Sequence, residues 1–139
     1  MCPGGVVVPA ASVEGTVVTN GMSYYSRDGV NANAALVASV DSRDFGDDPI
    51  KALSWQEGLE KAAWRLTGSY RAPAQTAGEF LAGRPGFAAG RVAPSYAIGV
   101  EGASFDTLFP PRVAAQLRLG LGVFGRRLPG FDAPDSFLT

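Results

Sequence analysis

The stretch that decides the fold is residues 1–40, MCPGGVVVPAASVEGTVVTNGMSYYSRDGVNANAALVASV. Its β-branched and apolar residues fall into three short runs, at residues 6–8, 17–19 and 34–40, which glycine-rich or polar residues separate. Runs of this kind are typical of strands. We therefore predict three strands between about residues 6 and 40.

Two turn signals connect these strands. Glu14-Gly15 separates the first run from the second, and Arg27-Asp28-Gly29 separates the second from the third. Because Asp-Gly suits tight hairpin geometry, the strands are expected to form an antiparallel meander. Asn20-Gly21 is itself a turn or bulge signal, so the sequence does not fix the residue at which the second strand ends.

Helical signals follow the strands. Asp48 suits an N-cap, Pro49 suits the first helical position, and Gly68 suits the end of the same helix. The predicted helices cover about residues 49–67, 75–82 and 111–127, and residues 84–109 are expected to be mostly irregular. Strands followed by helices favour a single α+β domain over residues 1–139, with a small antiparallel sheet of N-terminal strands packed with two or three helices.

Composition excludes several classes of function. The chain has 139 residues, a net charge of -1, no histidine and one cysteine, Cys2. It therefore lacks Ser-His-Asp and Cys-His catalysis, disulfides and cysteine-cluster metal sites, and no metal site is predicted. The near-neutral charge disfavours nucleic acid as a partner. No run is long and apolar enough for a membrane helix and no signal peptide is visible, so we expect a cytoplasmic location and no membrane contact.

Residues 120–125, GLGVFG, spell the G-x-G-x-x-G pattern of dinucleotide-binding loops. In such loops a strand precedes the glycines, and a ribose-binding acid follows about 20 residues later. Here the preceding residues have helical spacing, and the sequence runs only to Thr139. We therefore interpret these glycines as part of a helix and not as a nucleotide-binding loop.

Two stretches hold candidate chemistry. Cys2-Pro3-Gly4-Gly5 places a thiol beside a turn with accessible backbone amides, which fits either a poised thiolate or a plain strand-entry turn. Residues 20–33, NGMSYYSRDGVNAN, crowd amide, hydroxyl and guanidinium groups between two apolar runs. That composition fits a ligand-facing or domain-facing surface, but Asn and Asp equally favour turns. The residues alone predict no self-sufficient active site.

Three stretches together resemble a known family. They are residues 1–40, YRAPAQTAGEFLAGR at 70–84 and VAPSY at 92–96, followed by a helix ending in LPGF at 128–131. In this order they look like the middle part of the uncharacterised bacterial FAD-dependent dehydrogenases, also called NAD(FAD)-utilizing dehydrogenases. The elements MCPGG, NGMS, R-D-G-x-N-A-N-A-A and P-A-Q carry the resemblance, which extends over nearly the whole chain.

The resemblance implies a cap or substrate-side domain, inserted between the halves of an FAD-binding domain, that covers the flavin in a longer oxidoreductase. Met1 would then be an internal residue of that parent, and the excised chain would be inactive alone and hold no FAD. The implied partners are the FAD-binding domain of the same parent chain and an unidentified small-molecule substrate. The bared interface would favour a homodimer of the excised piece. The implied chemistry is hydride transfer at the flavin, which the cofactor performs.

The alternative is a stand-alone, non-enzymatic binding or interaction module. Under the resemblance, the signature residues and the polar side chains beside them would face the flavin, the substrate or the neighbouring domain. These candidates are Cys2, Pro3, Gly4, Gly5, Asn20, Gly21, Met22, Ser23, Arg27, Asn31 and Asn33. The resemblance assigns no catalytic residue and no metal ligand.

Overall fold

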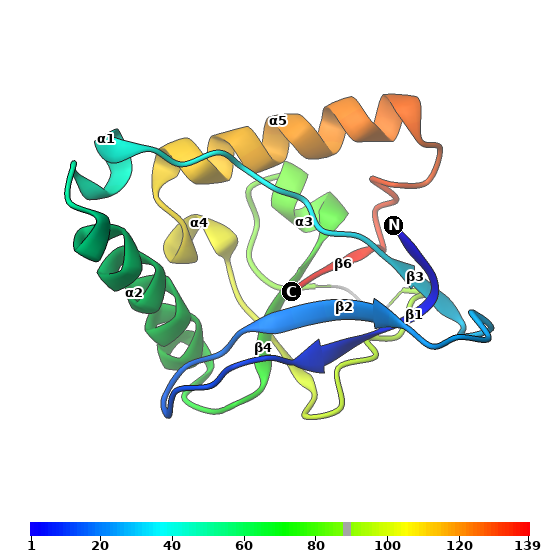
Figure 1. The fold of residues 1–139 in the computed structure, drawn as a ribbon. Coiled ribbons are helices and arrows are strands. Elements are labelled where there is room, and N and C mark those ends of the chain that lie inside the picture. The colour runs from blue at the N-terminus through cyan, green and yellow to red at the C-terminus, as the bar shows by residue number, and fades with distance from the viewer. Residues whose placement is uncertain (88–89) are drawn as a thin grey trace.

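The computed structural model describes residues 1–87 and 90–139. Figure 1 shows α5 along the top of the molecule, α2 at the left, and the N-terminal strands β1 and β2 below them. The elements, in chain order, are β1 (Cys2–Pro9), β2 (Thr19–Ser23), β3 (Asn31–Asn33), α1 (Ser42–Phe45), α2 (Pro49–Thr67), β4 (Ala72–Thr76), α3 (Ala77–Leu81), β5 (Val100–Gly102), α4 (Phe105–Leu108), α5 (Pro111–Arg127) and β6 (Phe137–Leu138).

The α+β class with an N-terminal antiparallel sheet is confirmed. The first sheet has the strand order β2-β1-β3, and both neighbours run antiparallel to β1. The predicted meander is wrong, because β3 pairs with β1 instead of β2. The β2–β3 loop, residues 24–30, therefore carries the chain from one side of β1 to the other. The pairing of β1 with β3 is irregular, with a register shift between Cys2 and Gly5.

The strand predicted at residues 34–40 is also wrong. The third strand is Asn31–Asn33, and residues 34–40 belong to no strand. One of their apolar side chains packs against helices instead, since Leu36 joins the core cluster of Phe80 and Leu121. The apolar pattern of this segment serves contact with a helix, and a short apolar run does not distinguish that use from strand pairing.

The second predicted strand, at residues 17–19, is displaced along the chain. β2 begins only at Thr19 and continues to Ser23, so Asn20-Gly21 does not end it. The N–H of Val17 donates to the carbonyl oxygen of Glu60 in α2, at 3.1 Å, and its side chain is buried in the core. Val17 therefore attaches the chain to a helix before β2 starts.

A second sheet, of order β5-β4-β6, has no counterpart among the sequence predictions. Its central strand β4 pairs in parallel with β5 and antiparallel with β6. All residues of β4 are buried. Because proline and polar residues such as Pro73 and Gln75 are uncommon in a central strand, the sequence does not predict a strand here. The helix predicted from residue 75 begins only at Ala77 because β4 ends at Thr76. Residues 84–109 are less irregular than expected, since they include β5 and α4.

The two long helices agree with their predicted bounds. The Asp48 carboxylate accepts a hydrogen bond from the N–H of Ile50, at 2.9 Å, where α2 begins. Gly68 follows α2 in the left-handed conformation, with φ +60°. α5 includes all of residues 120–125, so the interpretation of GLGVFG as helical is confirmed. No helix in the described ranges, 1–87 and 90–139, has the length and apolarity needed to span a membrane.

Buried side chains form two clusters. One cluster includes Val17 with residues of β4 and β5 and packs against Val7 of β1, and the other includes Phe80, Phe105 and Leu121. Gln75 is fully buried, and its side-chain Oε1 accepts a hydrogen bond from the N–H of Phe105, at 3.0 Å. This polar residue of β4 therefore fixes the start of α4 against the second sheet.

Candidate functional site

The side chain of Asn33 joins two strands of the N-terminal sheet. Its Nδ2 donates to the carbonyl oxygen of Val6 in β1, at 3.2 Å, and to that of Met22 in β2, at 3.0 Å. Asn33 itself lies in β3, on the other side of β1 from β2. Its amide therefore bridges all three strands and holds the MCPGG, NGMS and NAN stretches together.

Two of the predicted glycines make room for this amide. A Cβ added to Gly5 would overlap Nδ2 of Asn33, and one added to Gly21 would overlap its Oδ1. Both glycines lie in strands, where a missing side chain usually weakens the structure. Here the open space above them receives the Asn33 side chain, so the glycine at each position has a packing reason.

Gly4 and the β2–β3 loop pack backbone against backbone. Gly4 has φ +57°, and a Cβ at this position would overlap the carbonyl carbon and oxygen of Arg27. Arg27 has φ +53°, which costs a non-glycine residue about 1–2 kcal/mol. A Cβ at Gly29 would in turn meet the Gly4 carbonyl group. The close contact with β1 thus holds Arg27 in a strained conformation.

The stretch at residues 92–96 packs against the same sheet. Nδ2 of Asn31 donates to the carbonyl oxygen of Ala93, at 2.8 Å, and the N–H of Val7 donates to Oγ of Ser95, at 2.9 Å. Tyr96 is buried, and burial raises the pKa of its phenol. Two stretches that are about sixty residues or more apart in sequence therefore form one structural unit.

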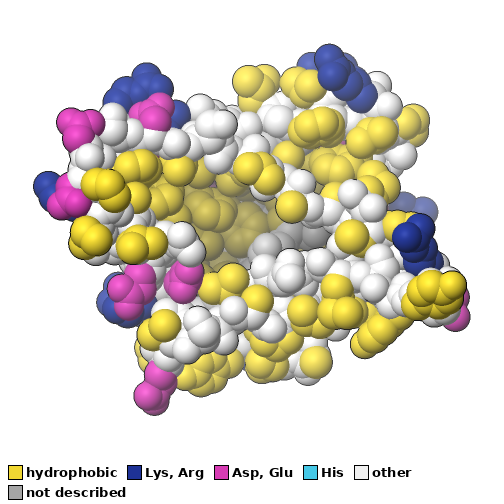
Figure 2. All heavy atoms as spheres, in the orientation of Figure 1, with side chains coloured by type: hydrophobic (Ala, Val, Ile, Leu, Met, Phe, Trp, Pro, Cys, Tyr) yellow, Lys and Arg dark blue, Asp and Glu magenta, His cyan; other side chains and the backbone are white. Residues whose placement is uncertain are grey.

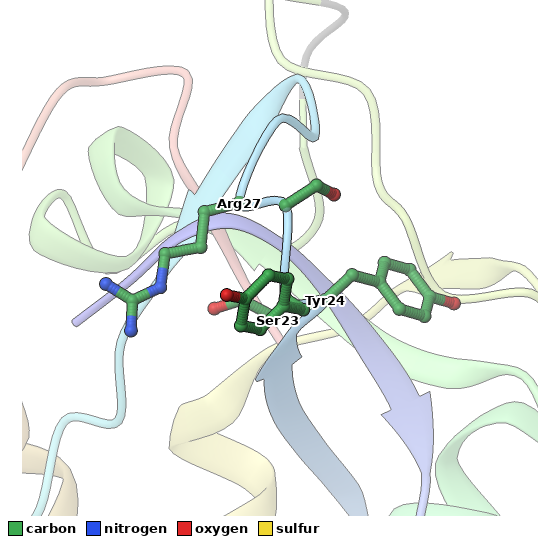
Figure 3. A pocket seen from close by; sticks show the side chains of 5 residues that line it. Ser23, Tyr24 and Arg27 are labelled. Atoms are coloured by element: carbon green, nitrogen blue, oxygen red, sulfur yellow. The ribbon is translucent and has the colours of Figure 1, made fainter.

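The β2–β3 loop projects from the sheet. Ser23, Tyr24, Tyr25, Ser26 and Arg27 line an open concavity on it. Figure 3 shows the guanidinium of Arg27 on one side of the loop and the ring of Tyr24 on the other, so these side chains do not converge on one enclosed point. Tyr25 is 104% exposed. The loop therefore presents its polar and aromatic side chains to solvent.

The structure places all the residues predicted for the site in the N-terminal sheet or its β2–β3 loop, with Asn20 and Cys2 toward opposite ends of β1. We call the set Cys2, Pro3, Gly4, Gly5, Asn20, Gly21, Met22, Ser23, Arg27, Asn31 and Asn33 the signature surface; its members lie in β1, β2, β3 and the β2–β3 loop. Gly4, Gly5, Gly21, Asn31 and Asn33 build its framework, as their contacts show. Arg27 and Asn20 are exposed. The surface therefore has a rigid base and polar groups open to contact.

Sequence reasoning missed several members of this site. Tyr24 and Tyr25 stand within the quoted stretch, but their exposure cannot be read from composition. The sequence indicated Gly29 only as part of a turn, and it indicated Ser95 only as part of the VAPSY element. The tyrosine pair beside an Asp-Gly turn is the signal that could have identified an exposed loop.

The chemistry available to the surface is binding and positioning. Cys2 is a free, half-buried thiol in β1, directly paired with Asn33 of β3. Within the part of the chain that the structure describes, no three His, Cys, Asp or Glu side chains gather to hold a metal ion. The groups that the loop offers are a guanidinium, hydroxyls and aromatic rings. Such groups can recognise a partner or ligand.

Residues 1–139 match the family described as "FAD-dependent protein, C-terminal domain-like". The chain belongs to this family. A protein of Clostridium beijerinckii (strain ATCC 51743 / NCIMB 8052), described as an uncharacterized protein, is 43% identical over 141 residues. The match covers 100% of this chain and 26% of that relative, so the chain spans about a quarter of the relative's length. Membership of the FAD-dependent family agrees with the resemblance seen in the sequence, and it supports FAD as the cofactor of the longer protein.

Proposed function

We propose that this chain is the cap, or substrate-side, part of a longer FAD-dependent oxidoreductase, inserted between the halves of its FAD-binding domain. The signature surface would face the flavin, the substrate or the FAD-binding domain. The observation that carries the proposal is the family match over residues 1–139. The rigid framework of the signature surface and its exposed loop support the choice of this face over the others.

The G-x-G-x-x-G pattern of this chain does not fit the pyrophosphate of FAD. The G-x-G-x-x-G pattern lies inside α5 and follows no strand, so its backbone amides are engaged in a helix. The space beside Gly125 is taken by the carboxylate of Asp132, which would repel a pyrophosphate. Under the proposal, the rest of the longer protein would form the FAD-binding site, and the cofactor itself would supply the redox chemistry.

The large accessible surface of the chain supports the proposal that part of this surface is covered by another domain in the longer protein. The accessible surface is 8314 Å² for 14.4 kDa, whereas about 6,800 Å² is expected for a compact monomer of this mass. The excess exceeds the ~800 Å² that each partner buries in a standard interface. Exposed large hydrophobic residues contribute to it, including Tyr25 and Val30 on the β2–β3 loop. A neighbouring domain would cover such groups.

The proposal is tested with the longer polypeptide and with residues 1–139 alone. We expect the longer protein to be yellow, with the absorbance of bound FAD, and the 139-residue chain to be colourless after the same purification. We also expect the isolated chain to show no oxidoreductase turnover. Stoichiometric FAD on the isolated chain, or turnover by it unaided, would contradict the proposal.

Partners are part of the same proposal. The FAD-binding domain of the same polypeptide would be the partner of the signature surface, and the substrate would be a small molecule. In isolation, the exposed hydrophobic residues would favour a homodimer. Sedimentation of the isolated chain and of the longer protein tests this expectation: a dimer formed only by the isolated chain would show that the two contacts use the same face.

A further inference from the structure

The segment between β3 and α1 is a connection outside the helices and strands. We call residues 34–40 the strap. Figure 1 shows it running across α5 from β3 to α1. Within the described part of the chain, its residues make no backbone-to-backbone hydrogen bond. Its peptide groups are therefore left to solvent or to a partner. The exception is the Ser39 carbonyl oxygen, which accepts a hydrogen bond from Gln116, at 3.2 Å, once the Gln116 amide is turned so that its nitrogen faces this oxygen.

The strap is held in place at both ends. Before it, the Asn33 amide bonds to β1 and β2. After it, the Asp41 carboxylate caps α1, and Asp44 forms an ion pair with Arg112 of α5. Within the strap, Leu36 packs into the core. An anchored, extended backbone loses little conformational freedom when another strand pairs with it.

An apolar groove runs beside the strap. Its volume is about 280 Å³, and its walls come from the strap, α2 and α5, including Leu36, Val40, Trp55, Leu59, Val113 and Leu117. Figure 2 shows a hollow with hydrophobic side chains on the face that the strap crosses. Val37 of the strap is 83% exposed beside it. Unpaired peptide groups and an apolar groove therefore lie side by side, which is the arrangement that binds an added strand.

The composition of the strap contains none of the features that protect an exposed strand. Residues 34–40, AALVASV, include no charge and no proline. Natural edge strands are usually blunted by lysine, proline or a bulge, and an uncovered apolar strand is an aggregation hazard. The strap is therefore expected to be covered in the protein's natural setting.

We propose that the strap accepts a β-strand from the FAD-binding part of the same longer polypeptide, with apolar side chains of that strand entering the groove. The inference rests on the proposed function, which supplies that partner. The chain spans 26% of its relative, so most of that protein lies outside it and is available as the source. A segment in the same polypeptide has a millimolar effective concentration, which suits a short strand whose pairing would be weak between separate molecules. The excess accessible surface is large enough to include this contact.

Hydrogen–deuterium exchange on the longer protein and on the 139-residue chain tests the inference. We expect the strap amides to exchange at least about tenfold more slowly in the longer protein. Val37→Lys places a charge on the exposed side of the strap, and it should remove this protection. Val13→Lys is the matched control, because Val13 is a 47% exposed valine in the β1–β2 connection, outside the groove. V37K should also speed exchange in one segment outside residues 1–139, which identifies the added strand.

The outcomes separate the inference from the proposed function. Strap protection that V37K removes and V13K preserves supports the inference. Fast strap exchange in a longer protein that holds FAD overturns the inference and leaves the proposed function intact. Protection that appears in the isolated chain as its concentration rises, together with a dimer in sedimentation, overturns it in favour of a second copy. A longer protein without FAD contradicts the proposed function, while its strap exchange still decides the inference.

Discussion

The side-chain nitrogen of Asn33 lies 3.0 Å from the carbonyl oxygen of Met22, although β1 separates the strands that carry these two residues. The amide crosses β1 above Gly5 and reaches Gly21 of β2, and the missing side chains of these glycines leave it room. One polar side chain thus joins the three strands of the N-terminal sheet. The N-terminal sheet is small, so this bridge has a measurable share in its stability.

Asn33→Ala should destabilise the chain by about 2 kcal/mol, because it removes two hydrogen bonds that each contribute about 1 kcal/mol. Asn20→Ala is the matched control, since Asn20 is an exposed asparagine of the neighbouring strand β2. The free energy of unfolding of the Asn20→Ala variant should differ from that of the unchanged chain by no more than about 0.5 kcal/mol. Urea unfolding of both variants measures the difference, and equal stability of the two would refute the bridging role.

Gly4→Ala and Gly15→Ala separate backbone strain from steric overlap. Both glycines have positive φ, +57° and +72°, so alanine costs about 1–2 kcal/mol at either position. Only at Gly4 would the added Cβ also overlap the Arg27 carbonyl group, whereas nothing lies within 4 Å of one at Gly15. We expect Gly4→Ala to cost about 1–3 kcal/mol more. Thermal unfolding checks this order, and a larger loss for Gly15→Ala would contradict the close contact between β1 and the loop.

The pair Asp44 and Arg112 should make stability sensitive to acid. The Arg112 hydrogen bond lowers the pKa of Asp44 below its ordinary value of 3.8. Because the folded pKa is the lower one, the pair's contribution is present above pH 3.8 and is lost as the pH falls through the folded value. Arg112→Gln should therefore flatten the fall in stability between about pH 5 and pH 2. Arg126→Gln, at an exposed end of α5, is the control and should leave that slope unchanged.

The elements predicted well from the sequence are those with local signals. Asp48, Pro49 and Gly68 mark the ends of α2 because capping depends on neighbouring residues only. The β-branched runs predicted an antiparallel N-terminal sheet, but they placed its third strand at residues 34–40 and gave a meander, and both of these predictions were wrong. The observed strand order depends on the Asn33 bridge and on the packing of Gly4 against Arg27, which are contacts between residues far apart in sequence.

The second sheet could not be predicted for a related reason. β4 is a short strand with a proline and a buried glutamine, and its stability comes from β5, β6 and the hydrogen bond between Gln75 and Phe105. The strap shows the opposite error, because its residues favour a strand and no strand among the described residues, 1–87 and 90–139, pairs with it. For the site, the resemblance and the residue types named the candidates of the signature surface, whose role stays a prediction, while the exposure of Tyr25 required the structure.

The exposed loop gives the last prediction, which concerns the longer protein. Tyr25 is 104% exposed, so Tyr25→Ser should change the stability of the isolated chain by no more than about 0.5 kcal/mol. If the β2–β3 loop contacts the FAD-binding domain, the same change in the longer protein removes a buried aromatic anchor, which is typically worth about 2 kcal/mol or more. Leu119→Ser is the control, since Leu119 is a 70% exposed residue of α5 outside the signature surface. Flavin retention and unfolding midpoints of the longer protein measure both. Equal effects of Y25S and L119S would show that the loop is not the contact, whereas a loss specific to Y25S would place it against the partner.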